Sequence, residues 1–156
     1  MKERTTTHAT FVIERDFNHP PARVFDAFAN AASKAKWFGG PEDWDKSNEA
    51  FDFRVGGKES VSGGPVGGPV HHYSATYWDI VPNERIVSSY EMHIDDQRIS
   101  VSLASMEFKA IGSRTKFVLT EHGIFLDGYD DAGERERGTN ELLGQLEAYL
   151  DAVRQP

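Results

Sequence analysis

The chain has 156 residues, a formal net charge of −8 at pH 7 and no cysteine. A chain of this length can bury a hydrophobic core of its own, and we expect a single domain over residues 8–153 behind a flexible N-terminal segment of residues 1–7. The absence of cysteine excludes disulfides, thiolate metal sites and a cysteine nucleophile. The negative charge disfavours binding to phosphate backbones, so we expect no nucleic-acid partner.

The N-terminal residues carry no export signal. Residues 1–8 are polar and lack the apolar stretch of a signal peptide, and nowhere do roughly eighteen apolar residues follow one another. We therefore expect a cytoplasmic protein without a membrane span, in a reducing compartment that suits a chain without cysteine.

The first part of the chain predicts a strand and two short helices. In residues 10–17, Phe11, Ile13 and Phe17 fall on one side and Glu14 and Asp16 on the other, as in a half-buried strand, and only Arg15 interrupts the apolar side. The segment 18–21 then supplies a cap and early-turn prolines for a helix over about residues 20–29. A second short helix is expected to end near Trp37.

Six further strands are expected, near residues 48–55, 57–62, 71–81, 85–94, 98–110 and 115–122. Residues 56–57 are glycines that join the first two with a positive φ, and the glycine- and proline-rich segment 63–69 predicts a mobile hairpin loop. Pro82 and Asn83 predict a turn between the fourth and fifth strands of the chain. Turns are also expected at residues 95–96 and 127–128.

The C-terminal part predicts an amphipathic helix of roughly 20 residues from about Glu134. Its apolar residues recur at steps of three and four: Leu142, Leu143, Leu146, Tyr149, Leu150 and Val153. Asp131 and Glu134 have the spacing of a capping box. Gly138 and Gly144 are unfavourable inside a helix, which indicates close approach to the sheet or room for a bound molecule.

This order of elements predicts an α+β protein with a helix-grip fold. A curved antiparallel sheet of about six or seven strands would wrap around the long C-terminal helix, because the apolar face of the helix must be buried against another layer. Two short helices would follow the first strand.

Several segments resemble one known family in the expected order. Residues 36–44 are similar to the tryptophan-aromatic-glycine-proline signature of the Hsp90-ATPase-activator-homologue-like branch of the START/Bet v 1 superfamily, and residues 77–87 resemble its Tyr-x-Asp-Ile-Val-Pro-x-Glu-Arg-Ile-Val signature. Residues 51–57, residues 120–123 and the final helix complete the pattern. The resemblance covers residues 8–153.

The resemblance implies a helix-grip fold with a cavity between the sheet and the C-terminal helix. It implies less about function, since such relatives include binders of lipids and polyketides, cyclases, dehydratases and cochaperone domains. We expect a non-enzymatic protein that binds a small hydrophobic molecule, as a monomer or weak homodimer. The alternatives are a cyclase- or dehydratase-like enzyme acting on an aromatic or polyketide-like substrate, and a module that contacts a chaperone.

The candidate ligand-binding residues are aromatic or soft side chains near the expected cavity, because such a site is mostly apolar with a few polar groups. Three of them, Trp37, Phe38 and Trp44, lie near the short helices. The others lie on the expected strands: Tyr73, Trp78, Tyr90, Met92, Phe117 and His122. Only one face of each strand can look inward, so only part of this set can line a cavity. The alternative is that these side chains fill the core.

The polar motifs predict no catalytic residue, metal or cofactor. Neighbouring strand residues point to opposite faces, so Glu121 and His122 cannot easily share one substrate, and the pair His71 and His72 has the same defect as a metal site. The glycine-rich segment 63–68 lacks the lysine that ends a phosphate-binding loop, and no Gly-x-Ser-x-Gly elbow occurs.

Overall fold

The computed structural model describes residues 3–41 and 43–152. The elements follow in the order β1 (Thr6–Phe17), α1 (Pro21–Ala29), α2 (Ala31–Trp37), β2 (Asp45–Phe51), β3 (Lys58–Gly64), β4 (His71–Val81), β5 (Arg85–Ile94), β6 (Gln97–Ile111), β7 (Arg114–Leu126) and α3 (Ala132–Ala152).

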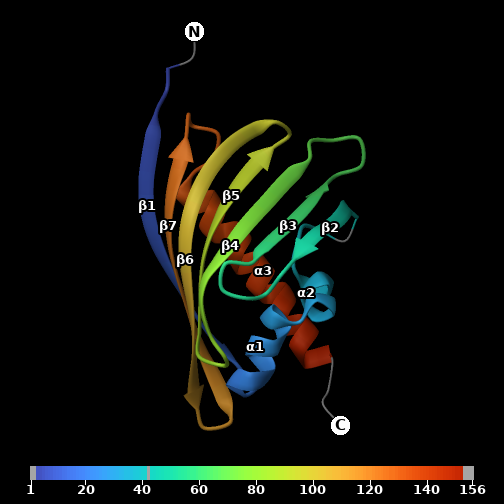
Figure 1. Ribbon diagram of the computed structural model, residues 1–156, viewed down its shortest axis with the longest axis vertical. Helices are drawn as coiled ribbons and strands as arrows, with labels where there is room; N and C mark the ends of the chain where they lie inside the picture. The colour runs from blue at the N-terminus through green and yellow to red at the C-terminus, as the bar shows by residue number, and fades with distance from the viewer. Residues whose placement is uncertain (1–2, 42, 153–156) are drawn as a thin grey trace.

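One sheet contains all seven strands in the order β1-β7-β6-β5-β4-β3-β2. Every neighbouring pair is antiparallel. The sheet curves around α3, which crosses its concave side, while α1 and α2 lie beside the C-terminal half of that helix (Figure 1). The predicted α+β helix-grip fold is confirmed.

Strand β1 pairs with β7, so the first and last strands of the chain lie side by side. Phe11, Ile13 and Phe17 are buried on the concave face, as their alternation predicts. Arg15 shares that face and reaches α3, where its Nη2 donates to the carbonyl oxygen of Asn140 at 3.3 Å. The charged residue that interrupts the apolar stripe therefore contacts the helix.

The core lies between the sheet, the two short helices and the C-terminal half of α3. Its fully buried side chains include Phe17 of β1, Phe117 of β7, and Leu146 and Leu150 of α3. Aromatic rings of α1 join them, since the ring of Phe28 stacks on Phe117 with centroids 5.6 Å apart. This packing places most of the apolar burial at one end of α3.

Several element boundaries differ from the sequence prediction. Strand β1 already begins at Thr6, and β3 runs on through Gly63 and Gly64, which we expected in the loop. Both glycines pair with β2, and a Cβ atom on Gly64 would lie only 2.1 Å from the carbonyl oxygen of Pro69. Glycine is required there because the returning chain approaches closely.

The helix termini also differ in part. Pro20 is the N-cap of α1 and no side chain caps that helix, whereas we expected a cap from residues 18–21. Helix α3 begins at Ala132, slightly before the predicted start, and the backbone N–H of Glu134 donates to Asp131 Oδ1 at 2.9 Å. The cap at Asp131 is therefore present, but the capping box predicted with Glu134 is only half formed, because the backbone N–H of Asp131 donates to Asp130 Oδ1. Val153, expected to close the helix, lies outside the described residues.

The turns lie where the sequence predicts them. Asn83, Asp95 and Asp127 have φ values of 66°, 53° and 56°, and Gly56 has a φ of 84°. Asparagine, aspartate and glycine tolerate this left-handed region better than other residues. In the part of the chain that the structure describes, no helix is long and apolar enough to cross a membrane.

Candidate functional site

The concave faces of β4 and β5 carry aromatic and soft side chains that α3 leaves partly uncovered. Tyr73 pairs with Met92 across the two strands, and the rings of Tyr73 and Tyr90 have centroids 5.0 Å apart. All three side chains are half-buried although they share the face of the buried Ala75 and Tyr77. Side chains that point inward and keep exposure indicate open space on the concave side.

The geometry of α3 explains this space. Its buried residues are Leu143, Leu146 and Leu150, all in the C-terminal half. In the N-terminal half, a Cβ atom on Gly138 would meet no atom within 4 Å. The buried contacts of α3 are therefore concentrated in its C-terminal half, and the position of Gly138 in the N-terminal half has free space around it.

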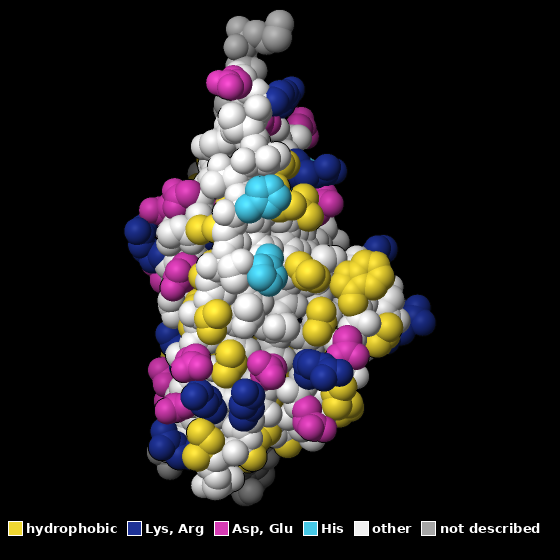
Figure 2. Space-filling view, turned by 90° about the vertical axis from the view of Figure 1, so that its left-hand side faces the viewer, with side chains coloured by type: hydrophobic (Ala, Val, Ile, Leu, Met, Phe, Trp, Pro, Cys, Tyr) yellow, Lys and Arg dark blue, Asp and Glu magenta, His cyan; other side chains and the backbone are white. Residues whose placement is uncertain are grey.

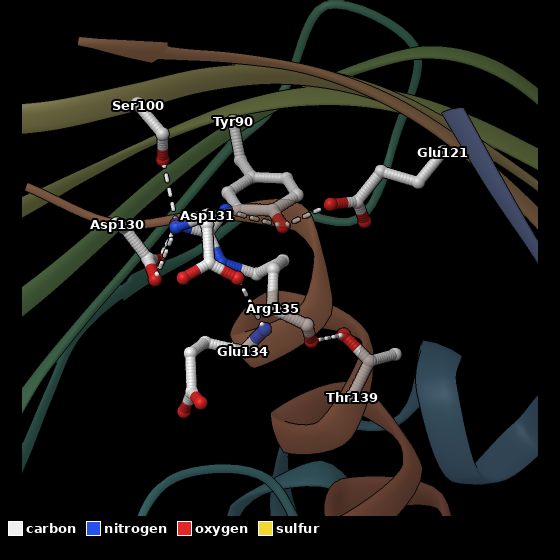
Figure 3. Close-up of polar contacts among 8 residues, drawn as sticks. All are labelled: Tyr90, Ser100, Glu121, Asp130, Asp131, Glu134, Arg135 and Thr139. Atoms are coloured by element: carbon white, nitrogen blue, oxygen red, sulfur yellow. Dashed lines mark hydrogen bonds and ion pairs between the residues drawn. The ribbon is translucent and has the colours of Figure 1, made fainter. Parts of the chain in front are cut away.

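A buried polar cluster lies at the N-terminal end of α3 (Figure 3). Tyr90 Oη donates to Glu121 Oε2 at 2.7 Å, and Arg135 Nη1 donates to Tyr90 Oη at 3.0 Å. Arg135 Nη2 also donates to Ser100 Oγ at 2.8 Å and to Asp130 Oδ2 at 2.9 Å. The cluster joins β5, β6 and β7 to the first turn of α3.

Burial shifts the protonation of this cluster. Glu121 is 2% exposed, and its burial raises the pKa of the carboxyl group, although the hydrogen bond from Tyr90 and the charge of Arg135 act in the opposite direction. Burial and the charge of Glu121 likewise raise the pKa of the Tyr90 phenol. The cluster thus presents a phenol, a carboxyl group and a guanidinium group, which can exchange hydrogen bonds with a hydroxyl or carbonyl group.

A second buried cluster joins α2 to β3 and β4. Lys34 Nζ donates to Glu59 Oε1 at 2.6 Å, and Tyr77 Oη donates to the same oxygen at 2.5 Å. The burial of Lys34 lowers the pKa of its ammonium group, while the neighbouring Glu59 opposes that shift. Lys34 Nζ also lies 4.4 Å from the centroid of the Phe38 ring.

Two of the candidate aromatic residues are part of the core. Trp37 is 4% exposed, and its Nε1 donates to the carbonyl oxygen of Ala27 at 3.0 Å. Phe117 is fully buried against Phe28 and Phe108. Both side chains stabilise the base of the fold and do not reach the open space.

Phe38 and Trp44 lie at the edge of the concave face. The Phe38 ring contacts Tyr73 with centroids 5.0 Å apart, so it continues the row formed by Tyr73 and Tyr90. Trp44 stacks on His71 at 4.9 Å and lies over Gly40, where a Cβ atom would be 2.2 Å from the indole ring. The glycine of the tryptophan-aromatic-glycine motif therefore makes room for Trp44.

Trp78 and His122 lie on the outer face of the sheet. Trp78 is 57% exposed, and its Nε1 donates to Ser89 Oγ at 2.8 Å. A β-bulge at this residue brings Ile80 to the inner side with Tyr77, whereas strict alternation predicts Ile80 beside Trp78. His122 is exposed and its Nδ1 lies 2.6 Å from Thr10 Oγ1. Neither side chain lines the space under α3.

Sequence reasoning considered Glu121 only as a partner of His122 and set that pair aside, and it missed Arg135 and the Lys34–Glu59 pair. Period-2 alternation from the apolar Phe117 and Leu119 leads to Glu121 on the inner face, so the strand pattern contained the signal for this residue. Helical spacing back from Leu146 and Leu142 likewise leads to Arg135. The Lys34–Glu59 pair left no such signal, because α2 is short and β3 is polar.

Neither cluster resembles a metal centre. Among residues 3–41 and 43–152, no group of three or more histidine, aspartate or glutamate side chains is arranged to hold a metal ion. The groups that meet instead mix cations, carboxylates and phenols, which suits hydrogen bonding to an organic molecule.

The match with a sequence family decides the identification. The model of the family described as Activator of Hsp90 ATPase homolog 1-like protein matches residues 18–151. The chain belongs to this Hsp90-activator-homologue-like family. The predicted membership, including the START/Bet v 1 type of fold, is confirmed. No curated protein matches the chain.

Solved structures agree with this family assignment. An uncharacterised protein from Rhizobium leguminosarum is 43% identical, with 97% of this chain and 99% of that chain covered and a TM-score of 0.89. The Mll3558 protein from Rhizobium loti is also 43% identical, with 93% and 99% covered and a TM-score of 0.85. An AHSA1-like protein from Aeromonas hydrophila shares the fold at 16% identity, with 92% and 93% covered and a TM-score of 0.69.

Proposed function

We propose that this member of the Hsp90-activator-homologue-like family binds a small, mostly apolar molecule between the concave face of the sheet and the N-terminal half of α3. One observation carries the proposal: Tyr73, Tyr90 and Met92 face inward and keep partial exposure beside a buried polar cluster. An apolar surface with a few oriented polar groups is the usual composition of a small-molecule site.

Apolar burial would supply most of the affinity. Each Å² of apolar surface removed from water contributes about 25 cal/mol, and the rings of Phe38, Tyr73 and Tyr90 offer that surface. The polar end of the ligand would lie at Tyr90, Glu121 and Arg135, where a hydroxyl or carbonyl group finds both donors and acceptors. The ligand class is therefore amphipathic, such as a phenol, a polyketide or a lipid.

The methyl resonance of Met92 in a protein labelled with ¹³C-methyl methionine tests this site. Titration with a panel of flavonoids, polyketides and lipids should shift the Met92 resonance, while the resonance of Met106, which packs against the core, should stay in place. A panel that leaves Met92 unchanged would contradict the proposal. Tyr90→Phe should weaken a hydroxylated ligand by roughly 0.5–1.5 kcal/mol, and the outer-face variant Trp78→Phe should leave affinity unchanged.

The raised pKa of Glu121 favours a second candidate function, a cyclase- or dehydratase-like enzyme. A buried carboxyl group with a raised pKa beside a phenol is suited to accept a proton from a bound substrate at near-neutral pH. Turnover of an aromatic or polyketide-like substrate should then be abolished in Glu121→Gln while ligand binding persists. Binding without turnover in the wild type supports the non-enzymatic function.

The family itself favours a third candidate, contact with a chaperone. Figure 2 shows hydrophobic side chains among charged ones on one side of the molecule, and the exposed apolar residues of the outer face include Val12, Leu103 and Trp78. Stimulation of an Hsp90 ATPase that is lost in Trp78→Ala would support this function. An unchanged ATPase rate would exclude it.

We propose a cytoplasmic monomer or weak homodimer as the active form. The lack of cysteine supports the cytoplasmic location, because a chain without cysteine suits a reducing compartment. Sedimentation velocity over a range of protein concentrations would separate the monomer from a dimer, and a stable larger assembly would contradict the proposal.

A further inference from the structure

A small pocket lies between α2 and the edge of the sheet formed by β2 and β3. Its volume is about 50 Å³, and its walls include Phe38, Phe51 and Val61 together with Lys34 and Glu59. A buried water needs about 10–15 Å³ by this measure, so the pocket has room for an organic molecule of roughly three or four heavy atoms. Asn48, which also lines the pocket, is exposed, so the pocket reaches solvent at the sheet edge.

The charged groups of this pocket are almost entirely buried. The side chain of Lys34 is 7% exposed and that of Glu59 is 2% exposed, and their atoms Nζ and Oε1 are 2.6 Å apart. Tyr77 Oη donates to the same carboxylate oxygen. An amine, a carboxyl group and a phenol therefore meet beside apolar walls.

This arrangement suits a nucleophilic amine. A lysine must lose its proton before it can attack, and burial lowers the pKa of Lys34 so that a larger fraction is neutral than in an exposed lysine. Glu59 is in direct contact with the ammonium group and can accept the proton. The phenol of Tyr77 holds Glu59 in that position.

We propose that Lys34 forms a Schiff base with a small aliphatic aldehyde held in this pocket. The carboxylate of Glu59 takes one proton from the ammonium group, and the neutral amine attacks the carbonyl carbon to form a C–N bond. A second proton moves from nitrogen to the former carbonyl oxygen. Glu59 then protonates that hydroxyl group, the C–O bond breaks and water leaves.

The product is a protonated imine paired with the carboxylate of Glu59. The three protons of the ammonium group end as two on water and one on the imine, so the total charge is unchanged and nothing is oxidised or reduced. Water can reverse the reaction. The small volume excludes aromatic aldehydes, and the carboxylate of Glu59 disfavours anionic carbonyl compounds such as keto acids.

Reductive trapping tests the proposal on the intact chain. The folded protein is incubated with propanal and cyanoborohydride, and the propylated lysines are located by peptide mass spectrometry. Lys34 should be propylated more than about tenfold faster than Lys36, because the pocket holds the carbonyl group beside the amine. Lys36 is the matched control, since it is exposed on the same helix.

Equal or faster labelling of Lys36, or no labelling of Lys34, would overturn the proposal and leave Lys34 as an ion-pair partner that joins α2 to the sheet. Benzaldehyde should not label Lys34, because it is too large for the pocket, and labelling as rapid as with propanal would also overturn the proposal. Tyr77→Phe keeps both charged groups and should slow the trapping of Lys34 without changing that of Lys36. An unchanged trapping rate at Lys34 in this variant would exclude proton transfer by a Glu59 that Tyr77 holds in place.

Discussion

Glu121 is an ionisable side chain that folding removes from water, so its protonation is coupled to stability. Burial raises the pKa of its carboxyl group above the ordinary value. In the pH window between the ordinary and the raised pKa, the folded state therefore holds more protons than the unfolded chain, and the free energy of unfolding falls as pH rises.

Glu121→Gln should remove this decrease in the free energy of unfolding with rising pH, because glutamine does not ionise. Glutamine also keeps an acceptor for Tyr90. From low to neutral pH, the free energy of unfolding of the variant should rise relative to wild type by about 1.4 kcal/mol for each unit by which folding raises the pKa. Urea denaturation at a series of pH values measures the difference. A difference that is constant over the series would contradict the coupling.

Trp37 and Trp78 are the same residue type in opposite environments. Trp37→Phe should destabilise the fold by about 2 kcal/mol, because it leaves a small cavity and an unpaired carbonyl group at Ala27. Trp78→Phe should change stability by less than about 1 kcal/mol, since the side chain is exposed. Urea denaturation measures the free energy of unfolding of both variants. A similar decrease in the two would show that the packing of Trp37 does not stabilise the fold.

At the scale of elements, α3 has two halves with different roles. Leu143, Leu146 and Leu150 anchor the C-terminal half in the core, whereas the first turn is held by the cap at Asp131 and by the polar contacts of Arg135. Apolar burial contributes more than hydrogen bonds that replace bonds to water, so most of the stability of α3 comes from its C-terminal half. The N-terminal half is the one that the proposed ligand would contact.

Gly138→Ala probes the free space around Gly138. A Cβ atom there meets nothing within 4 Å, so the variant should gain about 0.5–1 kcal/mol of stability from the better helix propensity of alanine. Thermal and urea unfolding measure the gain. A loss of stability would contradict the open space. Gly57→Ala is the contrasting variant, since its Cβ atom would lie 2.0 Å from the carbonyl oxygen of Asp52 and should destabilise the fold.

At the scale of the whole molecule, the net charge of −8 opposes compaction. Most of the ion pairs among the described residues have at least one exposed side chain and contribute little individually, as with Arg85 and Asp79, whose side chains are 51% and 42% exposed. Repulsion among the excess carboxylates is therefore expected to outweigh these pairs at low salt.

Raising the salt concentration from about 20 mM to about 200 mM should increase the free energy of unfolding at pH 7 by up to about 1 kcal/mol, because salt screens this repulsion. Urea denaturation at the two concentrations measures the change. Near the isoelectric point of about 5.2, where the net charge is small, the same salt step should have little effect. A decrease in stability at pH 7 would show that exposed ion pairs dominate.

Local patterns were sufficient for the elements of this protein but only partly for its candidate site. Alternation in residues 10–17 and the leucine spacing in α3 predicted a strand and a helix, because the period of each depends on backbone geometry alone. The same alternation leads from Phe117 to Glu121. Alternation gave the wrong face for Ile80 on β4. The bulge at Trp78 reverses which residues point inward, and no local pattern indicates that bulge.

The sequence by itself determined the order and type of the elements, the turn positions and the family, because these depend on neighbouring residues and on motifs contained in short segments. Only the tertiary structure decided which polar side chains meet. Tyr90, Glu121 and Arg135 come from three elements, and Lys34 and Glu59 from two others. Their contact depends on sheet curvature, strand register and the position of α3, which are set by packing over the whole molecule.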